Sequence, residues 1–125
     1  MFILVTSGYL FGQTDSTVYT IPMLDKRPMW IGCESDSCTE NMIFNFIKSN
    51  LTYPNHHDYE GKVYVQFIVE INGSTSNIII RKGLEKDLDN EVVRLISIMP
   101  DFIPGRLNGK PVRCRFIIPV NFSLY

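Results

Sequence analysis

The sequence predicts an α+β domain in two layers, a three-stranded antiparallel sheet with two helices on one face. Apolar and polar residues alternate along 62–71 and again along 112–122, the pattern of strands with one buried face. Two other stretches, 37–51 and 87–99, carry apolar residues at helical intervals. In chain order the elements run helix, strand, strand, helix, strand (α-β-β-α-β). Packing the apolar stripe of each helix on the apolar face of the sheet would bury both.

Residues 1–12 form an uncharged, mostly apolar run that ends at Gln13. The run is too short to span a bilayer, and it has the length and apolarity of the central region of a signal peptide. A basic start and a clear cleavage site are missing, so the alternative is a buried strand. We expect a remnant of an export signal here, and no stable membrane insertion.

Residues 13–36 are interpreted as an extended lead-in to a domain that covers 37–125. A short strand could form at 17–21, and Pro22 and Pro28 interrupt regular structure after it. The Met-Trp-Ile segment at 29–31 is expected to pack onto the domain.

Cys33 and Cys38 are five residues apart in a loop that also contains glycine and two serines. A disulfide between them is sterically possible and fits an oxidising compartment, although so short a loop would gain little stability from it. The alternatives are two free thiols or a partial metal site. Because the adjacent His56 and His57 would point apart, we expect no metal and no cofactor. Cys114 alternates with apolar residues and is interpreted as a small buried core residue.

The first helix is expected to start near Ser37, because Ser37 and Glu40 have the spacing of a capping box. It should end before Tyr53-Pro54, since the residue that precedes proline avoids helical backbone angles. Its apolar stripe consists of Met42, Ile43, Phe46, Ile47 and Leu51.

A hairpin follows from Gly61, and Asn72-Gly73 is expected to supply the positive φ angles of its tight turn. The return strand continues the buried face with Ile78 and Ile80 and ends at Gly83. The buried face of the first strand is expected to consist of Val63, Val65, Phe67, Val69 and Ile71.

The second helix should begin at about Asp87, a suitable N-cap residue, and stop at Pro100. Carboxylates at its start favour the helix dipole, and this role explains them better than acid–base catalysis does. After it, Phe102 is expected to fold inward and Asn108-Gly109 to form a turn. The apolar stripe of this helix consists of Leu88, Val92, Leu95, Ile96 and Met99.

The last strand contains Pro119, which cannot donate a ladder hydrogen bond and is therefore tolerated at the edge of a sheet. We therefore expect residues 112–122 at the sheet margin. The unpaired N–H and C=O groups of a margin can pair with a further strand. The buried face of this strand is expected to consist of Val112, Cys114, Phe116, Ile118, Val120 and Phe122.

The composition fits one globular domain without a nucleic-acid partner. The 125 residues are 45% hydrophobic and 12% aromatic, enough for a core and against disorder. The formal net charge is −1 and the basic residues are scattered. Without a basic stripe, neither nucleic acid nor an anionic membrane is an expected partner.

Several short motifs follow one another in fixed order and spacing over about residues 28–122. They are Tyr53-Pro54, Gly61-x-Val63-x-Val65-x-Phe67, Leu88-Asp89-x-Glu91, Met99-Pro100-x-Phe102-x-Pro104-Gly105 and Gly109-Lys110-Pro111-Val112. Together they resemble the C-terminal domain of TonB, the protein that transmits inner-membrane energy to outer-membrane receptors.

The resemblance implies a periplasmic interaction module, not an enzyme, that lends a sheet edge to a partner. The implied partner is an extended peptide of an outer-membrane receptor or of another envelope protein. Because the sequence shows no membrane anchor and no proline-rich spacer, we do not expect it to transduce force as full TonB does. The implied partner-binding residues are Arg113, Cys114, Arg115, Phe116, Ile117 and Ile118, together with Tyr53 and Pro54.

Two other hypotheses remain at this point. The first is a structural domain that forms a homodimer through the same edge and has no transport role. The second is a hydrolase that uses Cys33 or His57 as its reactive group, although no catalytic motif accompanies either residue.

Overall fold

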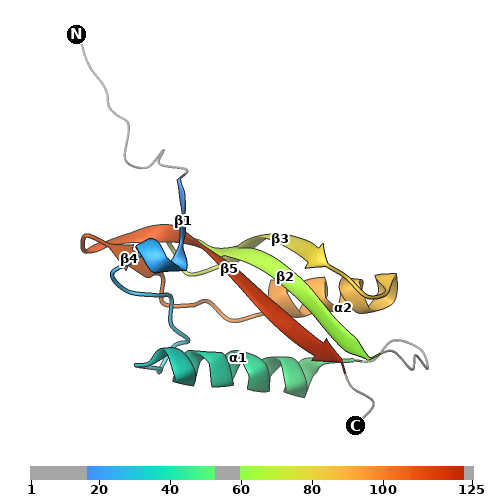
Figure 1. Cartoon of the computed structure of the whole chain (residues 1–125). Coiled ribbons are helices and arrows are strands. Elements are labelled where there is room, and N and C mark those ends of the chain that lie inside the picture. The colour runs from blue at the N-terminus through green and yellow to red at the C-terminus, as the bar shows by residue number, and fades with distance from the viewer. Residues whose placement is uncertain (1–16, 53–59, 123–125) are drawn as a thin grey trace.

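The computed structural model describes residues 17–52 and 60–122. Within them two helices lie along one face of a five-stranded sheet whose strand order is β1-β5-β2-β3, with β4 also pairing with β5 (Figure 1). The elements in chain order are β1 (Val18–Thr20), the 3-10 turn η3 (Ile21–Met23), α1 (Asp36–Asn50), β2 (Gly61–Val69), β3 (Thr75–Lys82), α2 (Lys86–Ser97), β4 (Gly105–Leu107) and β5 (Lys110–Phe122).

The predicted α+β class is confirmed, and the predicted three-stranded antiparallel sheet is its centre. β2 pairs antiparallel with β3 on one side and with β5 on the other. The two additional strands, β1 and β4, are each three residues long and both pair with the first half of β5.

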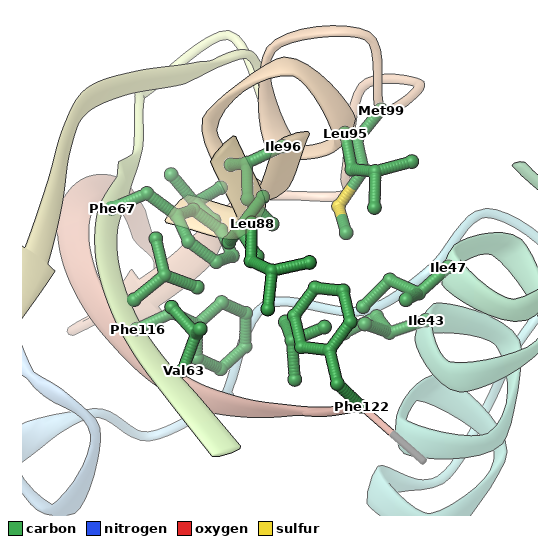
Figure 2. Packing of buried hydrophobic residues seen from close by; sticks show 14 of the residues in the cluster. Ile43, Ile47, Val63, Phe67, Leu88, Leu95, Ile96, Met99, Phe116 and Phe122 are labelled. Carbon is green, nitrogen blue, oxygen red and sulfur yellow. The ribbon is translucent and has the colours of Figure 1, made fainter. Parts of the chain in front are cut away.

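The core lies between the sheet and the two helices, where side chains from both layers meet (Figure 2). The odd residues of β2 from Val63 to Val69 are fully buried, which confirms the predicted register of this strand. On β5 the even residues Cys114, Phe116, Val120 and Phe122 are buried as predicted. Ile71 was assigned wrongly, because β2 ends before it and its side chain is 46% exposed in the turn.

Both helix starts differ from the predictions. The N-cap of α1 is Ser35 and not Ser37, because the Ser35 hydroxyl accepts a 3.1 Å hydrogen bond from the N–H of Cys38. The N-cap of α2 is Glu85, and Asp87 lies inside the first turn, where a carboxylate still faces the positive end of the helix dipole. Each predicted start was therefore wrong by one or two residues.

The predicted turns form, with one change in backbone geometry. Asn108 and Gly109 both have positive φ angles, of 54° and 79°, as a tight turn between β4 and β5 requires. In the β2–β3 turn Gly73 has a positive φ angle, of 89°, and Asn72 does not. The Asn72 side chain instead accepts a 3.0 Å hydrogen bond from the N–H of Ser74.

The lead-in forms backbone bridges to the segment that follows α2. Met29 and Ile103 exchange two hydrogen bonds of 3.0 and 2.8 Å, which fix the chain just before α1. The half-buried Trp30 packs against Phe46 and Phe102, with ring centroids 5.9 and 5.8 Å away. The packing predicted for residues 29–31 therefore holds for Met29 and Trp30, but Ile31 is 63% exposed.

Several predictions concern residues outside the described ranges. These are the export signal at 1–12, Tyr53-Pro54, and the adjacent His56 and His57. Between residues 17 and 52 and between 60 and 122, neither helix has the length and apolarity needed to cross a membrane.

Candidate functional site

The outer side of β5 has a covered half and an open half. Its inner side pairs with β2 from Cys114 to Phe122. On the outer side, β1 pairs with residues 113–115. β4 pairs with residues 110–112 through Val112 and Lys110, even residues like those that face β2. From residue 116 to 122 no strand of the described chain pairs with this side. The predicted sheet margin is therefore correct for the second half of β5 and wrong for the first, which the lead-in covers.

The backbone of the open half directs its odd residues outward. The N–H of Glu70 bonds to the carbonyl of Ser74 across the β2–β3 hairpin, so even residues of β2 face β3 and odd ones face β5. In the observed register, odd residues of β2 lie opposite even residues of β5. Ile117, Pro119 and Asn121 consequently point their backbone groups away from β2. The missing N–H of Pro119 thus costs the β2–β5 ladder no hydrogen bond.

A groove of about 960 Å³ runs between this open edge and α1. In Figure 1, α1 lies below the arrow of β5, and both elements run toward the same end of the molecule. The groove is lined from α1 by Asp36, Thr39, Glu40, Ile43, Phe44, Ile47 and Lys48, and from β5 by residues 116–121. Ile21, Arg27, Pro28, Leu51 and Lys62 complete the lining.

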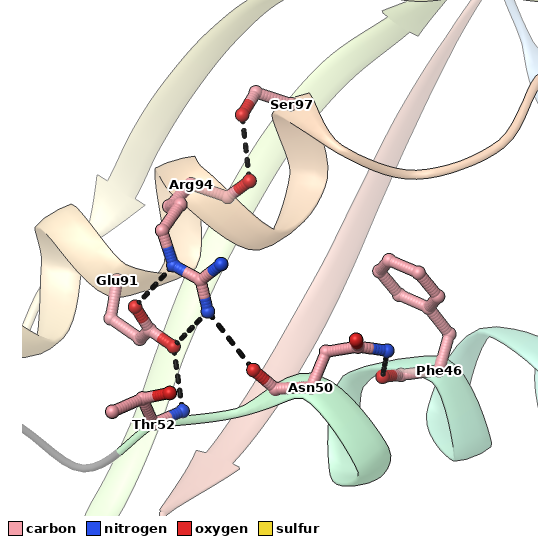
Figure 3. Close-up of polar contacts among 6 residues, drawn as sticks. All are labelled: Phe46, Asn50, Thr52, Glu91, Arg94 and Ser97. Carbon is pink, nitrogen blue, oxygen red and sulfur yellow. Dashed lines mark hydrogen bonds and ion pairs between the residues drawn. The ribbon is translucent and has the colours of Figure 1, made fainter.

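A polar network holds the last turn of α1 against α2 (Figure 3). The Arg94 guanidinium binds the Glu91 carboxylate at 2.7 and 2.8 Å and also donates a 2.9 Å bond to the carbonyl of Asn50. The Glu91 carboxylate accepts a 2.7 Å bond from the N–H of Thr52. These bonds, that from Arg94 above all, lower the pKa of Glu91 although burial opposes the shift. Glu91 is 9% exposed, so this network fixes one end of the groove wall from within the fold.

The first turns of α1 are held by Thr39. Its hydroxyl accepts a 3.1 Å bond from the N–H of Trp30 and contacts the sulfur of Met29 at 3.3 Å. Thr39 is only 4% exposed, so this contact anchors the other end of the groove wall to the lead-in.

Cys33 and Cys38 lie at the same end of α1. Their sulfur atoms are 2.02 Å apart and their Cα atoms 5.6 Å apart, so the structure brings the predicted pair together. Arg27 and Asp36 form a 3.0 Å ion pair nearby, at the rim of the groove.

The predicted partner-binding residues separate into two groups. Phe116, Ile117 and Ile118 border the groove. In contrast, residues 113–115 pair with β1, and the guanidinium of Arg113 donates a 2.8 Å bond to Glu70, which lowers the pKa of that carboxyl. Cys114 is fully buried as predicted, and burial raises the pKa of its thiol to about 11.

The groove-facing side of α1 was not among the predicted site residues. Asp36, Glu40, Phe44 and Lys48 succeed one another at intervals of four residues, so they lie along one side of the helix. Phe44 was the available signal, because it is a large aromatic residue outside the apolar stripe of the helix. In the structure it is 58% exposed.

The hydrolase hypothesis relied on Cys33, which is paired with Cys38, and on His57, which lies outside the described residues. In the described part of the chain, no three His, Cys, Asp or Glu side chains are grouped as metal ligands.

Comparisons with known proteins agree with the fold and with the motifs. A solution structure of the TonB C-terminal domain from Helicobacter pylori matches with a TM-score of 0.56 and 21% identity, over 73% of this chain and 85% of that one. No curated protein sequence matches the chain. The family model described as Gram-negative bacterial TonB protein C-terminal matches residues 49–124, more than half of the sequence. The chain therefore belongs to the family of TonB C-terminal domains.

Proposed function

We propose that this protein binds an extended segment of another envelope protein as an added strand along the open half of β5. TonB C-terminal domains are non-catalytic interaction domains of the Gram-negative envelope. The observation that carries the proposal is the outward direction of the backbone groups of Ile117, Pro119 and Asn121 beside the groove. An added strand would satisfy these groups, and alternate side chains of the bound segment would enter the groove.

The proposed site is shorter than the family resemblance implied. It consists of the edge from residue 116 to 121. The outward backbone groups of Arg113 and Arg115 become available only if β1 leaves, and Cys114 pairs with β2. Tyr53 and Pro54 follow the end of α1 in sequence and stay part of the proposal. An outer-membrane receptor as the partner, and a transport-related role without force transduction by this chain, also belong to the proposal.

The proposal includes export to the periplasm and a Cys33–Cys38 disulfide in the mature protein. The apolar run at 1–12 and the close approach of the two sulfur atoms support it.

The experiment compares Ile117→Pro with Ile117→Ala. Proline removes the outward N–H without touching the β2 ladder, whereas alanine keeps that N–H and removes only the side chain. A photo-crosslinking residue at Asn121 reports binding in cells of the native host, and circular dichroism checks that both variants fold. We expect crosslinks to an envelope protein in wild type and Ile117→Ala, and their loss in Ile117→Pro.

Equal crosslinking in all three folded proteins would overturn the proposal. Crosslinks to a second copy of the chain alone would favour the dimeric structural domain instead.

A further inference from the structure

The α1 wall of the groove carries opposite charges at its two ends. Glu40, Phe44 and Lys48 all line the groove and are exposed. Asp36 already pairs with Arg27. Glu40 and Lys48, in contrast, form no ion pair with any described residue. The wall therefore presents a carboxylate, an aromatic ring and an ammonium in that order, and neither charge has an ion-pair partner among residues 17–52 and 60–122.

The spacing of these three residues matches one face of an extended peptide. Eight residues of α-helix separate Glu40 from Lys48, which corresponds to about 12 Å along the axis. A strand rises about 3.3 Å per residue, so about four residues of an added strand cover this distance. Because side chains alternate along a strand, positions p, p+2 and p+4 point to the same face. The face turned toward the groove meets α1, because the groove is lined by α1 on one side and by residues 116–121 of β5 on the other. In Figure 1 the two elements run in the same direction.

We propose that the groove selects a peptide with a basic residue, an apolar residue and an acidic residue at alternate positions. The basic side chain lies against Glu40, the apolar one on Phe44 and the acidic one against Lys48. This inference rests on the proposed strand addition and specifies the chemistry of the partner. Complementary charges of this kind select among partners more than they add affinity.

The chain's own sequence argues for a partner other than a second copy. Among its 125 residues, no segment places Lys or Arg, an apolar residue and Asp or Glu at p, p+2 and p+4 in either charge order. Two segments have opposite charges at p and p+4, Arg81 with Glu85 and Asp58 with Lys62, but their central residues are Gly83 and Glu60.

Two synthetic peptides test the selection. The sequences Ac-TKTVTET-NH2 and Ac-TETVTKT-NH2 differ only in the order of their charges. Chemical-shift titration of the full chain at low ionic strength measures both dissociation constants. We expect one peptide to bind about fivefold to tenfold tighter than the other, because two weak, exposed charge contacts are attractive in one order and repulsive in the other. The preferred order reports the direction in which the bound peptide runs relative to β5.

The double variant Glu40→Lys with Lys48→Glu should invert the preference. The matched control, Lys82→Glu with Asp101→Lys, exchanges the charges of two exposed residues that do not line the groove and should leave it unchanged. High salt should bring the two dissociation constants together in every protein.

Equal affinity of the two peptides, no binding of either, or a preference that the Glu40/Lys48 exchange leaves intact would overturn the inference. The Ile117→Pro variant separates this failure from failure of the proposed function. If both peptides bind wild type equally and Ile117→Pro abolishes the binding of both, strand addition is supported and charge selection is wrong. If Ile117→Pro, still folded, binds as wild type does, the proposed function itself is wrong.

Discussion

The N–H of Phe102 donates a 2.8 Å hydrogen bond to the carbonyl of Gly73, which joins the β2–β3 turn to the segment that follows α2. The two backbones lie so close that a Cβ at position 73 would be 1.9 Å from the Phe102 carbonyl oxygen. Phe102 is 3% exposed and contacts the rings of Trp30, Phe67 and Phe116. A turn at one end of the sheet therefore helps to place an aromatic cluster in the core.

Gly73→Ala should destabilise the protein by more than about 2 kcal/mol, because both the positive φ and the Phe102 backbone oppose a side chain. Gly109→Ala is the matched control, since its φ is also positive, at 79°, but nothing lies within 4 Å of its Cβ. It should lose only about 1 kcal/mol. Urea unfolding measures both, and equal losses would show that the Phe102 contact adds nothing.

Phe67→Ala and Phe116→Ala should each cost about 3–5 kcal/mol, because each leaves a cavity between the sheet and the helices (Figure 2). Gln66→Ala, on the other face of β2, should change the free energy of unfolding by only about 0.5 kcal/mol. Its side chain accepts a hydrogen bond from the exposed Arg81. A loss for Gln66→Ala as large as that for Phe67→Ala would contradict the assigned register.

Glu91→Gln should reduce stability at neutral pH by about 1–2 kcal/mol, because the charged bonds to Arg94 are lost. The pKa of Glu91 is lowered in the fold, so the ionised carboxylate contributes stability above the pKa of the unfolded state. That contribution disappears as pH falls from about 4 through the lower folded pKa. The difference between wild type and variant should therefore shrink on acidification, whereas Glu40→Gln should show little difference at any pH. If the difference in unfolding free energy between wild type and Glu91→Gln persists at low pH, the stability loss comes from packing and not from the ionised carboxylate.

Iodoacetamide should label none of the three cysteines in the native, non-reduced protein at pH 8. Cys114 is fully buried and its pKa is raised to about 11, so very little of the reactive thiolate exists. Unfolding without reductant should expose one thiol, and unfolding with reductant should expose three.

Mass spectrometry of protein from the native host would also test removal of about the first dozen residues. An intact Met1 with three labelled thiols before reduction would refute both export and the disulfide.

Arg113→Ala should weaken partner binding less than twofold, although the family resemblance places Arg113 in the binding strand. Its guanidinium bonds to Glu70 at 2.8 and 3.1 Å, and β1 covers its segment of the edge. Titration with the peptide that wild type prefers measures the effect. A tenfold loss with the fold intact would move the site toward the first half of β5.

The parts of the fold that follow from local pattern were predictable. Alternation along β2 and β5 determined which side chains are buried, because the pleat fixes their direction. The pairing of β1 with β5 was not predictable, since three residues carry too little pattern to indicate a partner strand. The choice of Ser35 over Ser37 as N-cap depended on backbone geometry that two nearby serines do not distinguish in sequence.

The candidate site was predictable only in part. Pro119 indicated an edge. That its backbone groups point away from β2 could be determined only from the register of the β2–β5 pairing. The groove exists only because α1 lies beside the open half of β5, so the sequence alone does not mark Glu40, Phe44 and Lys48 as parts of a site. Such residues contribute nothing to the core, so no burial pattern marks them in the sequence.

The short parallel strand β1 also protects the protein against uncontrolled association. An open sheet edge as long as the 13-residue β5 would invite edge-to-edge aggregation. β1 covers this edge at residues 113–115, and in the second half Pro119 lacks a donor and α1 lies beside the edge. What is left uncovered among the described residues is the stretch from 116 to 122, long enough to pair with a single short strand.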